Sequence, residues 1–231
     1  MRRTMLVLAL AALIATMMAL AGPSLAKDTD QKQKTYTNSI EARQYLALPP
    51  SEDDVRGSGF RGSATPLEDE DSGPGLPGYL DTRITYTGGV PIRGDTNVIT
   101  GGAWMLCSQF TAPPRDPNTG QLIDPKCTSD SRISLKGTWI RGTATWRDEA
   151  AGESNCLRES VYAGVADVKG DLTVTEGTVN NKTVKEGTGK FEGTIDHSPL
   201  ALPMDQYPCL VNDKPNPERA PIVTGTMNLK F

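Results

Sequence analysis

Four cysteines and a single histidine are the residues of this sequence best suited to covalent or metal chemistry. The N-terminal segment predicts export, and an even number of cysteines in an exported chain predicts two disulfides. Three pairings of Cys107, Cys127, Cys156 and Cys209 exist. We favour Cys107–Cys127 with Cys156–Cys209, because the first bridge closes a short loop around a proline-rich stretch. A zinc site is disfavoured, since no CxxC spacing is present and His197 has no cysteine nearby.

The histidine lies in the run Asp196-His197-Ser198, which contains the three residue types of a hydrolytic triad. Adjacent residues of an extended chain point in opposite directions, so these neighbours cannot converge as a triad requires. The sequence also has no GxSxG motif. We therefore interpret His197 as a loop or strand-edge residue. The sequence favours a non-catalytic protein, and we predict no cofactor and no metal site.

Oxygen-bearing side chains are frequent between Asp116 and Asp124, where Ca²⁺ could find ligands. The alternative is a turn stabilised by Asx hydrogen bonds, which Asn118 and Gly120 favour without any metal. We predict the turn.

The three tryptophans and Phe191 fall in stretches with strand character. If the fold is a barrel, these side chains could line a cavity for a small apolar ligand, and the alternative is that they form the core. The candidate cavity-lining residues are Trp104, Trp139, Trp146 and Phe191.

The N-terminal segment has the order of a secretory signal peptide. Arg2 and Arg3 precede an apolar run, and Ser24 and Ala26 are small residues before a cleavage point at Lys27. An uncleaved membrane anchor is the alternative. We predict a signal peptide over residues 1–26, a secreted or periplasmic mature protein, and no stable membrane span after cleavage. With a net charge of −4 and one histidine, the chain has no electrostatic footprint for nucleic acid.

The next segment, residues 27–78, is rich in acids, glycine and proline. Such a composition buries too little apolar surface to offset the entropy of ordering. We predict a flexible segment over 27–78, with one short helix over 39–48, and a single β domain over 79–231.

From Tyr79 onward, short β-branched and aromatic stretches alternate with turn residues, a pattern typical of all-β folds. Within Arg132–Trp146 the alternation changes phase near Trp139, which predicts a bulge or bend there. Gly-Thr pairs recur inside the predicted strands, and glycine there permits strong coiling. The fold class we predict is an antiparallel barrel, or a strongly coiled sandwich, of about eight strands.

The stretch Glu186–Gly193, read as EGTGKFEG, resembles the Gly-Thr-Gly-x-Phe-x-Gly hairpin of the allene oxide cyclase-like and dirigent-like small β-barrels. The resemblance implies a closed antiparallel barrel with an apolar cavity. It covers eight residues and transfers no catalytic residue to this chain.

The apolar residues that precede Phe231 share one face of a strand with it. They are Leu229, Met227 and Val223. This pattern is similar to the final strand of outer-membrane barrels. We favour the final strand of a soluble barrel, because aromatic residues make up only 6% of the chain. The predicted function is an exported barrel or sandwich that binds a small apolar ligand or a protein partner. The alternatives are a cyclase- or isomerase-like barrel enzyme acting on a hydrophobic substrate, and an outer-membrane barrel.

Overall fold

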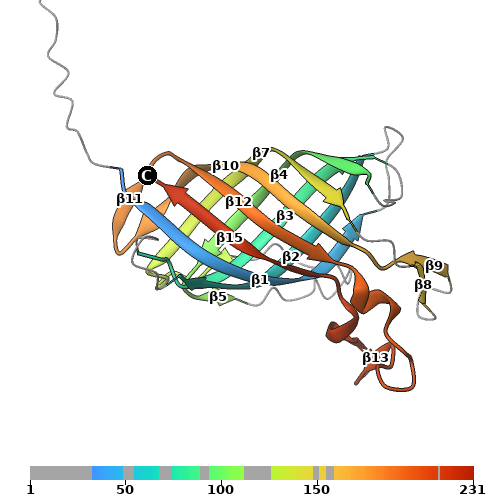
Figure 1. Cartoon of the computed structure of the whole chain (residues 1–231). Coiled ribbons are helices and arrows are strands. Elements are labelled where there is room, and N and C mark those ends of the chain that lie inside the picture. Colours follow the sequence, from blue (N-terminus) through green and yellow to red (C-terminus); the bar gives the residue numbers. More distant parts are fainter. Residues whose placement is uncertain are drawn as a thin grey trace, which may run out of the picture. The chain divides into compact units, whose positions relative to one another are not determined.

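The computed structural model describes residues 33–48, 55–67, 74–88, 94–111, 126–147, 151–154, 159–212 and 214–231. Eight long antiparallel strands form a closed barrel in which each strand pairs with the next one along the chain (Figure 1). They are β1 (Thr35–Leu48), β2 (Val55–Pro66), β3 (Gly78–Thr87), β4 (Thr96–Cys107), β7 (Ile133–Trp146), β10 (Val165–Val179), β12 (Gly187–Asp196) and β15 (Ile222–Lys230). Pairing of β15 with β1 closes the barrel. The predicted fold class is confirmed.

Short elements fill the connections between the barrel strands. They are β5 (Phe110–Thr111) with β6 (Lys126–Cys127), β8 (Ala151–Ser154) with β9 (Glu159–Tyr162), β11 (Lys182–Val184), η1 (Ser198–Ala201), β13 (Leu210–Val211) with β14 (Lys214–Pro215), and η2 (Pro217–Arg219). Figure 1 shows β5 and β11 at the barrel end where the chain terminates, and β8, β9 and β13 at the opposite end. Among the described residues, no helix has the length and apolar character needed to cross a membrane.

Glycines make room for the aromatic rings inside the barrel. A methyl group at Gly137 would overlap the ring of Trp104, and one at Gly170 would overlap the ring of Trp139. Phe191 lies in the same way against two glycines, Gly193 and Gly225 of β12 and β15. In three of the recurring Gly-Thr pairs, at Gly137, Gly193 and Gly225, glycine therefore points inward, where a ring covers it, and threonine points outward.

The predicted irregularity near Trp139 is a β-bulge. The register of β7 against β10 pairs Arg141 with Asp171 and Trp139 with Leu172, which leaves Ile140 without a partner on β10. Trp139 points inward, while Ile140 points outward and is 52% exposed.

The predicted helix over 39–48 is wrong, because these residues belong to β1. Ile40 and Ala42 point into the core while Ser39 and Glu41 point outward, an alternation of period two. An isolated ten-residue helix is marginal in water, whereas β1 gains a hydrogen-bonded neighbour on each side, β2 and β15.

The barrel also begins earlier than predicted, since it includes two strands from the predicted flexible segment 27–78. Glycine in β2 has a packing role here: a side chain at Gly62 would overlap the main chain of Glu41 and Ala42. The segment that follows β2 is held to β1 by the buried side-chain amide of Asn38. This amide donates to the carbonyl oxygen of Leu76 at 2.6 Å and accepts from the N–H of Leu76 at 3.0 Å. The predicted signal peptide lies outside the described residues, as do residues 52–54 and 68–71, which carry acidic side chains of the predicted flexible segment.

Gly137→Ala tests the role of glycine in the core. The added methyl group would overlap both Trp104 and the carbonyl oxygen of Thr173, so we expect the free energy of unfolding to fall by about 3 kcal/mol. Gly101→Ala is the matched control, because its methyl group would meet only Thr85 Oγ1 at 3.5 Å. Its effect should stay within about 0.5 kcal/mol in urea denaturation. Equal stabilities of the two variants would contradict the packing argument.

Candidate functional site

The four candidate cavity-lining residues all lie inside the barrel, within one hydrophobic core. Trp139 and Phe191 border a void of about 20 Å³, and their rings meet edge to face at 5.7 Å between centroids. A void of that size holds one water molecule at most. Around this void, the aromatic rings therefore occupy the space that an internal ligand would need.

Each buried indole N–H has a hydrogen-bond acceptor. Trp104 donates to the carbonyl oxygen of Thr173 at 3.1 Å, Trp139 to Thr82 Oγ1 at 2.8 Å, and Trp146 to Asn97 Oδ1 at 2.7 Å. Buried polar groups with satisfied partners hold a core in one arrangement, and these bonds leave the indoles with a packing role.

The run Asp196-His197-Ser198 does not form a triad. The Asp196 carboxylate accepts a hydrogen bond from the main-chain N–H of Ser198 at 2.8 Å. His197 precedes η1, and its ring lies 4.8 Å from that of Trp146. The prediction of a loop histidine is confirmed.

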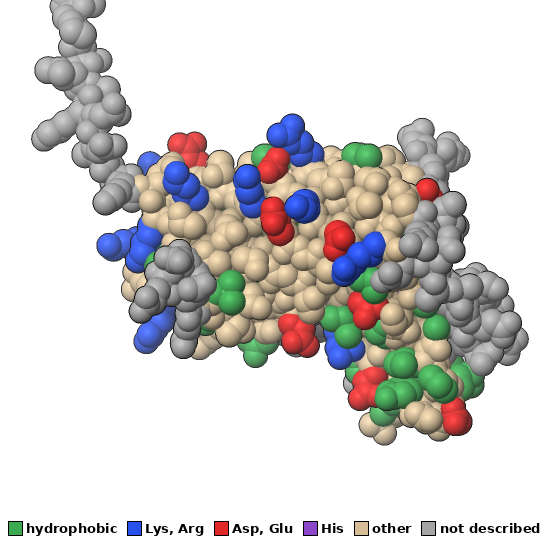
Figure 2. All heavy atoms as spheres, viewed as in Figure 1, with side chains coloured by type: hydrophobic (Ala, Val, Ile, Leu, Met, Phe, Trp, Pro, Cys, Tyr) green, Lys and Arg blue, Asp and Glu red, His purple; other side chains and the backbone are tan. Residues whose placement is uncertain are grey.

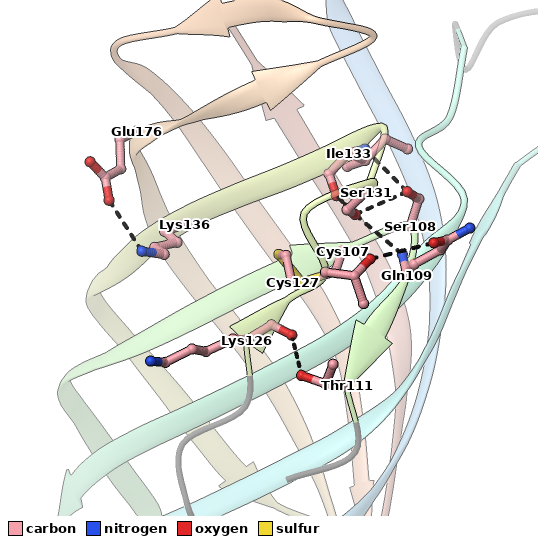
Figure 3. The surroundings of a disulfide bond; sticks show 11 residues. Cys107, Ser108, Gln109, Thr111, Lys126, Cys127, Ser131, Ile133, Lys136 and Glu176 are labelled. Atoms are coloured by element: carbon pink, nitrogen blue, oxygen red, sulfur yellow. Dashed lines mark hydrogen bonds and ion pairs between the residues drawn. A yellow bond between two sulfur atoms is a disulfide. The ribbon is translucent and has the colours of Figure 1, made fainter.

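A disulfide joins Cys107, at the end of β4, to Cys127 in β6 (Figure 3). Beside it, Ser108 and Ser131 join their hydroxyl groups at 3.0 Å across the base of the loop. Cys209 is also disulfide-bonded, and its predicted partner Cys156 lies outside the described residues. So does the candidate calcium stretch 116–124. Within the described part of the chain, no group of three or more histidine, cysteine or acidic residues is placed to hold a metal ion.

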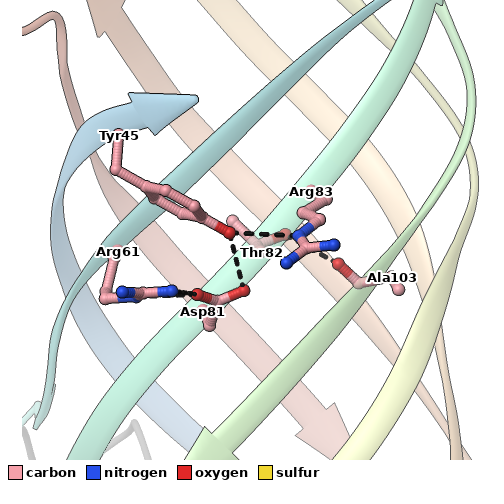
Figure 4. A network of polar contacts seen from close by, with 6 residues as sticks. All are labelled: Tyr45, Arg61, Asp81, Thr82, Arg83 and Ala103. Carbon is pink, nitrogen blue, oxygen red and sulfur yellow. Dashed lines mark hydrogen bonds and ion pairs between the residues drawn. The ribbon is translucent and has the colours of Figure 1, made fainter. Parts of the chain in front are cut away.

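A polar network on the outer wall joins β1, β2 and β3, and we call it the Asp81 network (Figure 4). Asp81 is 6% exposed although it points away from the core. Its carboxylate accepts from Arg61 Nε at 2.8 Å and from the Tyr45 hydroxyl at 3.2 Å, and that hydroxyl accepts from Arg83 Nε at 3.1 Å. The Arg61 guanidinium also lies against two rings, 4.2 Å from the centroid of Tyr45 and 5.3 Å from that of Phe110 in β5. The network thus ties the disulfide loop to the barrel wall.

Burial raises the pKa of Tyr45 above its ordinary value of 10.0, and the negative charge of Asp81 acts in the same direction. The hydrogen bond from Arg83 and the positive charges of Arg83 and Arg61 oppose this shift. The hydroxyl is therefore held as a neutral donor to Asp81.

The outer wall is hollowed where β7, β10, β12, β15 and β1 run side by side. We call this hollow of about 430 Å³ the outer groove. It is lined by Thr35, Ile140, Arg141, Asp171, Leu172, Thr188, Gly189, Lys190, Asn228, Leu229 and Lys230. A second hollow of about 420 Å³ adjoins it and shares Arg141, Asp171 and Lys190. Figure 2 shows charged side chains scattered over the face formed by β10, β12 and β15.

No protein-family model matches this chain, and no match was found among the curated proteins or among the solved structures. The resemblance of Glu186–Gly193 to the small-barrel families remains a prediction.

The outer groove and the Asp81 network were not found from the sequence. The change of phase predicted an irregularity near Trp139, but by sequence pattern Ile140 belonged to the same face as Gly142 and Ala144, so its exposed position was not predicted. Tyr45 and Arg61 belong to the segment predicted to be flexible, so nothing in the sequence indicated that they meet Asp81.

Replacing both cysteines of the first bridge, as Cys107→Ala with Cys127→Ala, tests the loop anchor. The two residues are 20 apart in sequence, so the loss of this constraint should lower the free energy of unfolding by about 3 kcal/mol. Hydrogen exchange should accelerate at Phe110 and Thr111 before it does in β10. Unchanged stability and exchange would show that the wall contacts hold the loop without the bridge.

Tyr45→Phe tests the Asp81 network. Removing the hydroxyl leaves Asp81 with one donor fewer, and we expect a loss of about 1–2 kcal/mol near neutral pH. Because the folded-state pKa of Tyr45 is raised, the wild-type stabilisation is complete below pH 10 and is lost as the pH rises through the folded pKa. The variant should lose less stability over that alkaline range. Tyr79→Phe is the control, since Tyr79 is 55% exposed on β3, and an identical pH dependence in both variants would refute the assignment.

Proposed function

We propose that this protein is an exported, non-catalytic binding barrel that binds small molecules or proteins on its outer surface. The filled interior is the observation that supports this proposal most directly. Ligand pockets for small molecules usually measure about 300–1,000 Å³. The void beside Trp139 is about 20 Å³, while the outer groove is about 430 Å³.

Export is supported by two features that point the same way. The predicted signal peptide over residues 1–26 directs the chain out of the cytoplasm. The Cys107–Cys127 bridge and the bonded state of Cys209 are what an oxidising compartment permits. Secretion or a periplasmic location accounts for both.

A cyclase- or isomerase-like enzyme is the weaker candidate. Such a barrel would have to orient a hydrophobic substrate in an enclosed cavity that excludes water. Here Phe191, the aromatic residue of the stretch resembling those families, packs over Gly193 and Gly225 and occupies interior space itself.

The distribution of side chains in this barrel is the opposite of that in an outer-membrane barrel. Transmembrane barrels carry an apolar band outside and a polar interior. In β15 the apolar residues Val223, Met227 and Leu229 point into the core and are at most 6% exposed. The neighbouring outer wall bears charged residues such as Lys190 and Arg141.

A protein partner is the second candidate occupant of the outer surface, and one observation favours it. Met204, Leu210 and Val211 are 44%, 56% and 43% exposed in the connection between β12 and β15. The buried Arg219 holds this connection in shape by donating to the carbonyl oxygens of Tyr207 and Leu200 at 2.7 and 3.1 Å. Figure 2 shows hydrophobic side chains gathered at this end of the barrel.

Native mass spectrometry of the protein purified from its own host tests the proposal. We expect a mature chain that begins near Lys27 and contains two disulfides. Any small molecule that co-purifies should be lost on dialysis while the chain keeps its folded charge-state distribution, because an outer site opens directly to solvent. A molecule retained until the barrel unfolds would show an internal site and refute the proposal.

A further inference from the structure

We infer that the outer groove binds a monoanionic amphiphile, a molecule with one carboxylate or sulfonate and an apolar alkyl or aromatic group. This inference rests on the proposed function and names a ligand class for it. It depends on the shape of the groove, its apolar surface and its charge.

The groove is built from residues far apart in sequence that the barrel register places in one row. Arg141 of β7 is opposite Asp171 of β10, Asp171 is opposite Lys190 of β12, and Lys190 is opposite Asn228 of β15. Lys230 lies two residues beyond Asn228 in β15, on the same face of the strand and opposite Thr188. The row crosses the strands, so an elongated ligand would lie across the barrel wall.

The apolar part of the groove comes from one bulged residue and from the stems of the basic side chains. Ile140 is 52% exposed beside the row. Leu172 and Leu229 are each 1% exposed, so at these positions the floor is strand main chain. Lysine and arginine present several methylene groups before their charge, and such stems cover apolar surface well. An alkyl chain or a flat ring would contact Ile140 and these stems together.

The charged part of the groove favours an anion. Arg141, Lys190 and Lys230 give three positive charges against the one negative charge of Asp171, a net charge of 3 − 1 = +2, although the whole chain carries −4. Asp171 is already engaged by Arg141 Nε at 2.9 Å. Within the described residues, neither Lys190 nor Lys230 forms an ion pair. Both lysines line the groove, and we infer that together they contact a single carboxylate.

A larger anion fits this surface less well than a small one. Nucleic acid binding depends on many phosphate contacts, and this groove offers two lysines and one paired arginine. The adjoining hollow adds Lys169 and Glu192, whose charges cancel. One anionic group and a short apolar group match what the groove contains.

Titration of the ¹⁵N-labelled mature protein with sodium octanoate tests the inference, with amide shifts as the readout. We expect saturable shifts centred on Ile140, Gly189, Lys190 and Leu229. Octyltrimethylammonium, which has the same chain and the opposite charge, should bind at least about tenfold more weakly. Absence of binding at millimolar octanoate, equal affinity for the two octyl compounds, or shifts centred elsewhere would each overturn the inference.

Variants on the exposed surface assign the contacts without disturbing the core. Lys190→Gln with Lys230→Gln should weaken octanoate binding about tenfold or more, and Ile140→Ser should weaken it severalfold. Lys182→Gln, in the exposed β11, is the matched control and should leave the affinity unchanged. Unchanged binding in the double lysine variant would overturn the assignment.

Two further measurements separate this inference from related outcomes. Sedimentation with phosphatidylglycerol vesicles tests whether the groove binds a lipid surface instead of a free small molecule. If the protein sediments with the vesicles and the double lysine variant does not, the small-molecule assignment is overturned. If octanoate fails to bind while a co-purified molecule is lost on dialysis, the ligand class is wrong and outer-surface binding stands. If a molecule is held until unfolding, the proposed function itself fails.

Discussion

The width of a closed eight-stranded barrel is the constraint on which the rest of this structure depends. Such a barrel has room inside for one packed set of side chains or for one small ligand. In this chain, rings occupy that room because glycines on facing strands let them lie close to the main chain, as Trp104 does over Gly137. With the indole N–H groups hydrogen-bonded, the interior provides stability, and for this reason we place the proposed binding on the outer wall.

Closure of the barrel adds a second requirement, which is that the first and last strands meet. β1 pairs with β15 through nine consecutive positions, and the ring of Phe231 stacks on that of Tyr36 at 4.8 Å. Each end of the barrel then has its own anchor. The disulfide and the Asp81 network hold the loop between β4 and β7, while Arg219 holds the connection between β12 and β15. The wall between the two ends, which contains the groove, is supported by neither anchor and depends on strand pairing and on the core beneath it.

The sequence predicted those features that depend on local pattern. The strands after Tyr79, the bulge near Trp139 and the Cys107–Cys127 bridge are all observed. β1 was missed because the residues of 39–48 are compatible with a helix, and β2 was missed because its glycines lower its local strand character. Both strands depend on partners distant in sequence, such as β15 for β1. The groove could not be predicted for the same reason, since Ile140 and Lys230 become neighbours only when the barrel closes.

The bulge in β7 links the core to the groove. Trp139 lies inward, and so do Gly142, Ala144 and Trp146 in the next part of the same strand. The inward residues have odd numbers up to Trp139 and even numbers from Gly142 onward. Strict alternation cannot bury both sets, so the strand needs one extra residue between them, and that residue is Ile140. Its apolar side chain is therefore exposed on the wall as a consequence of how the core is completed. Because the main chain at the bulge is fixed by Trp139 beneath it, the outer groove is positioned rigidly by the packing of the interior.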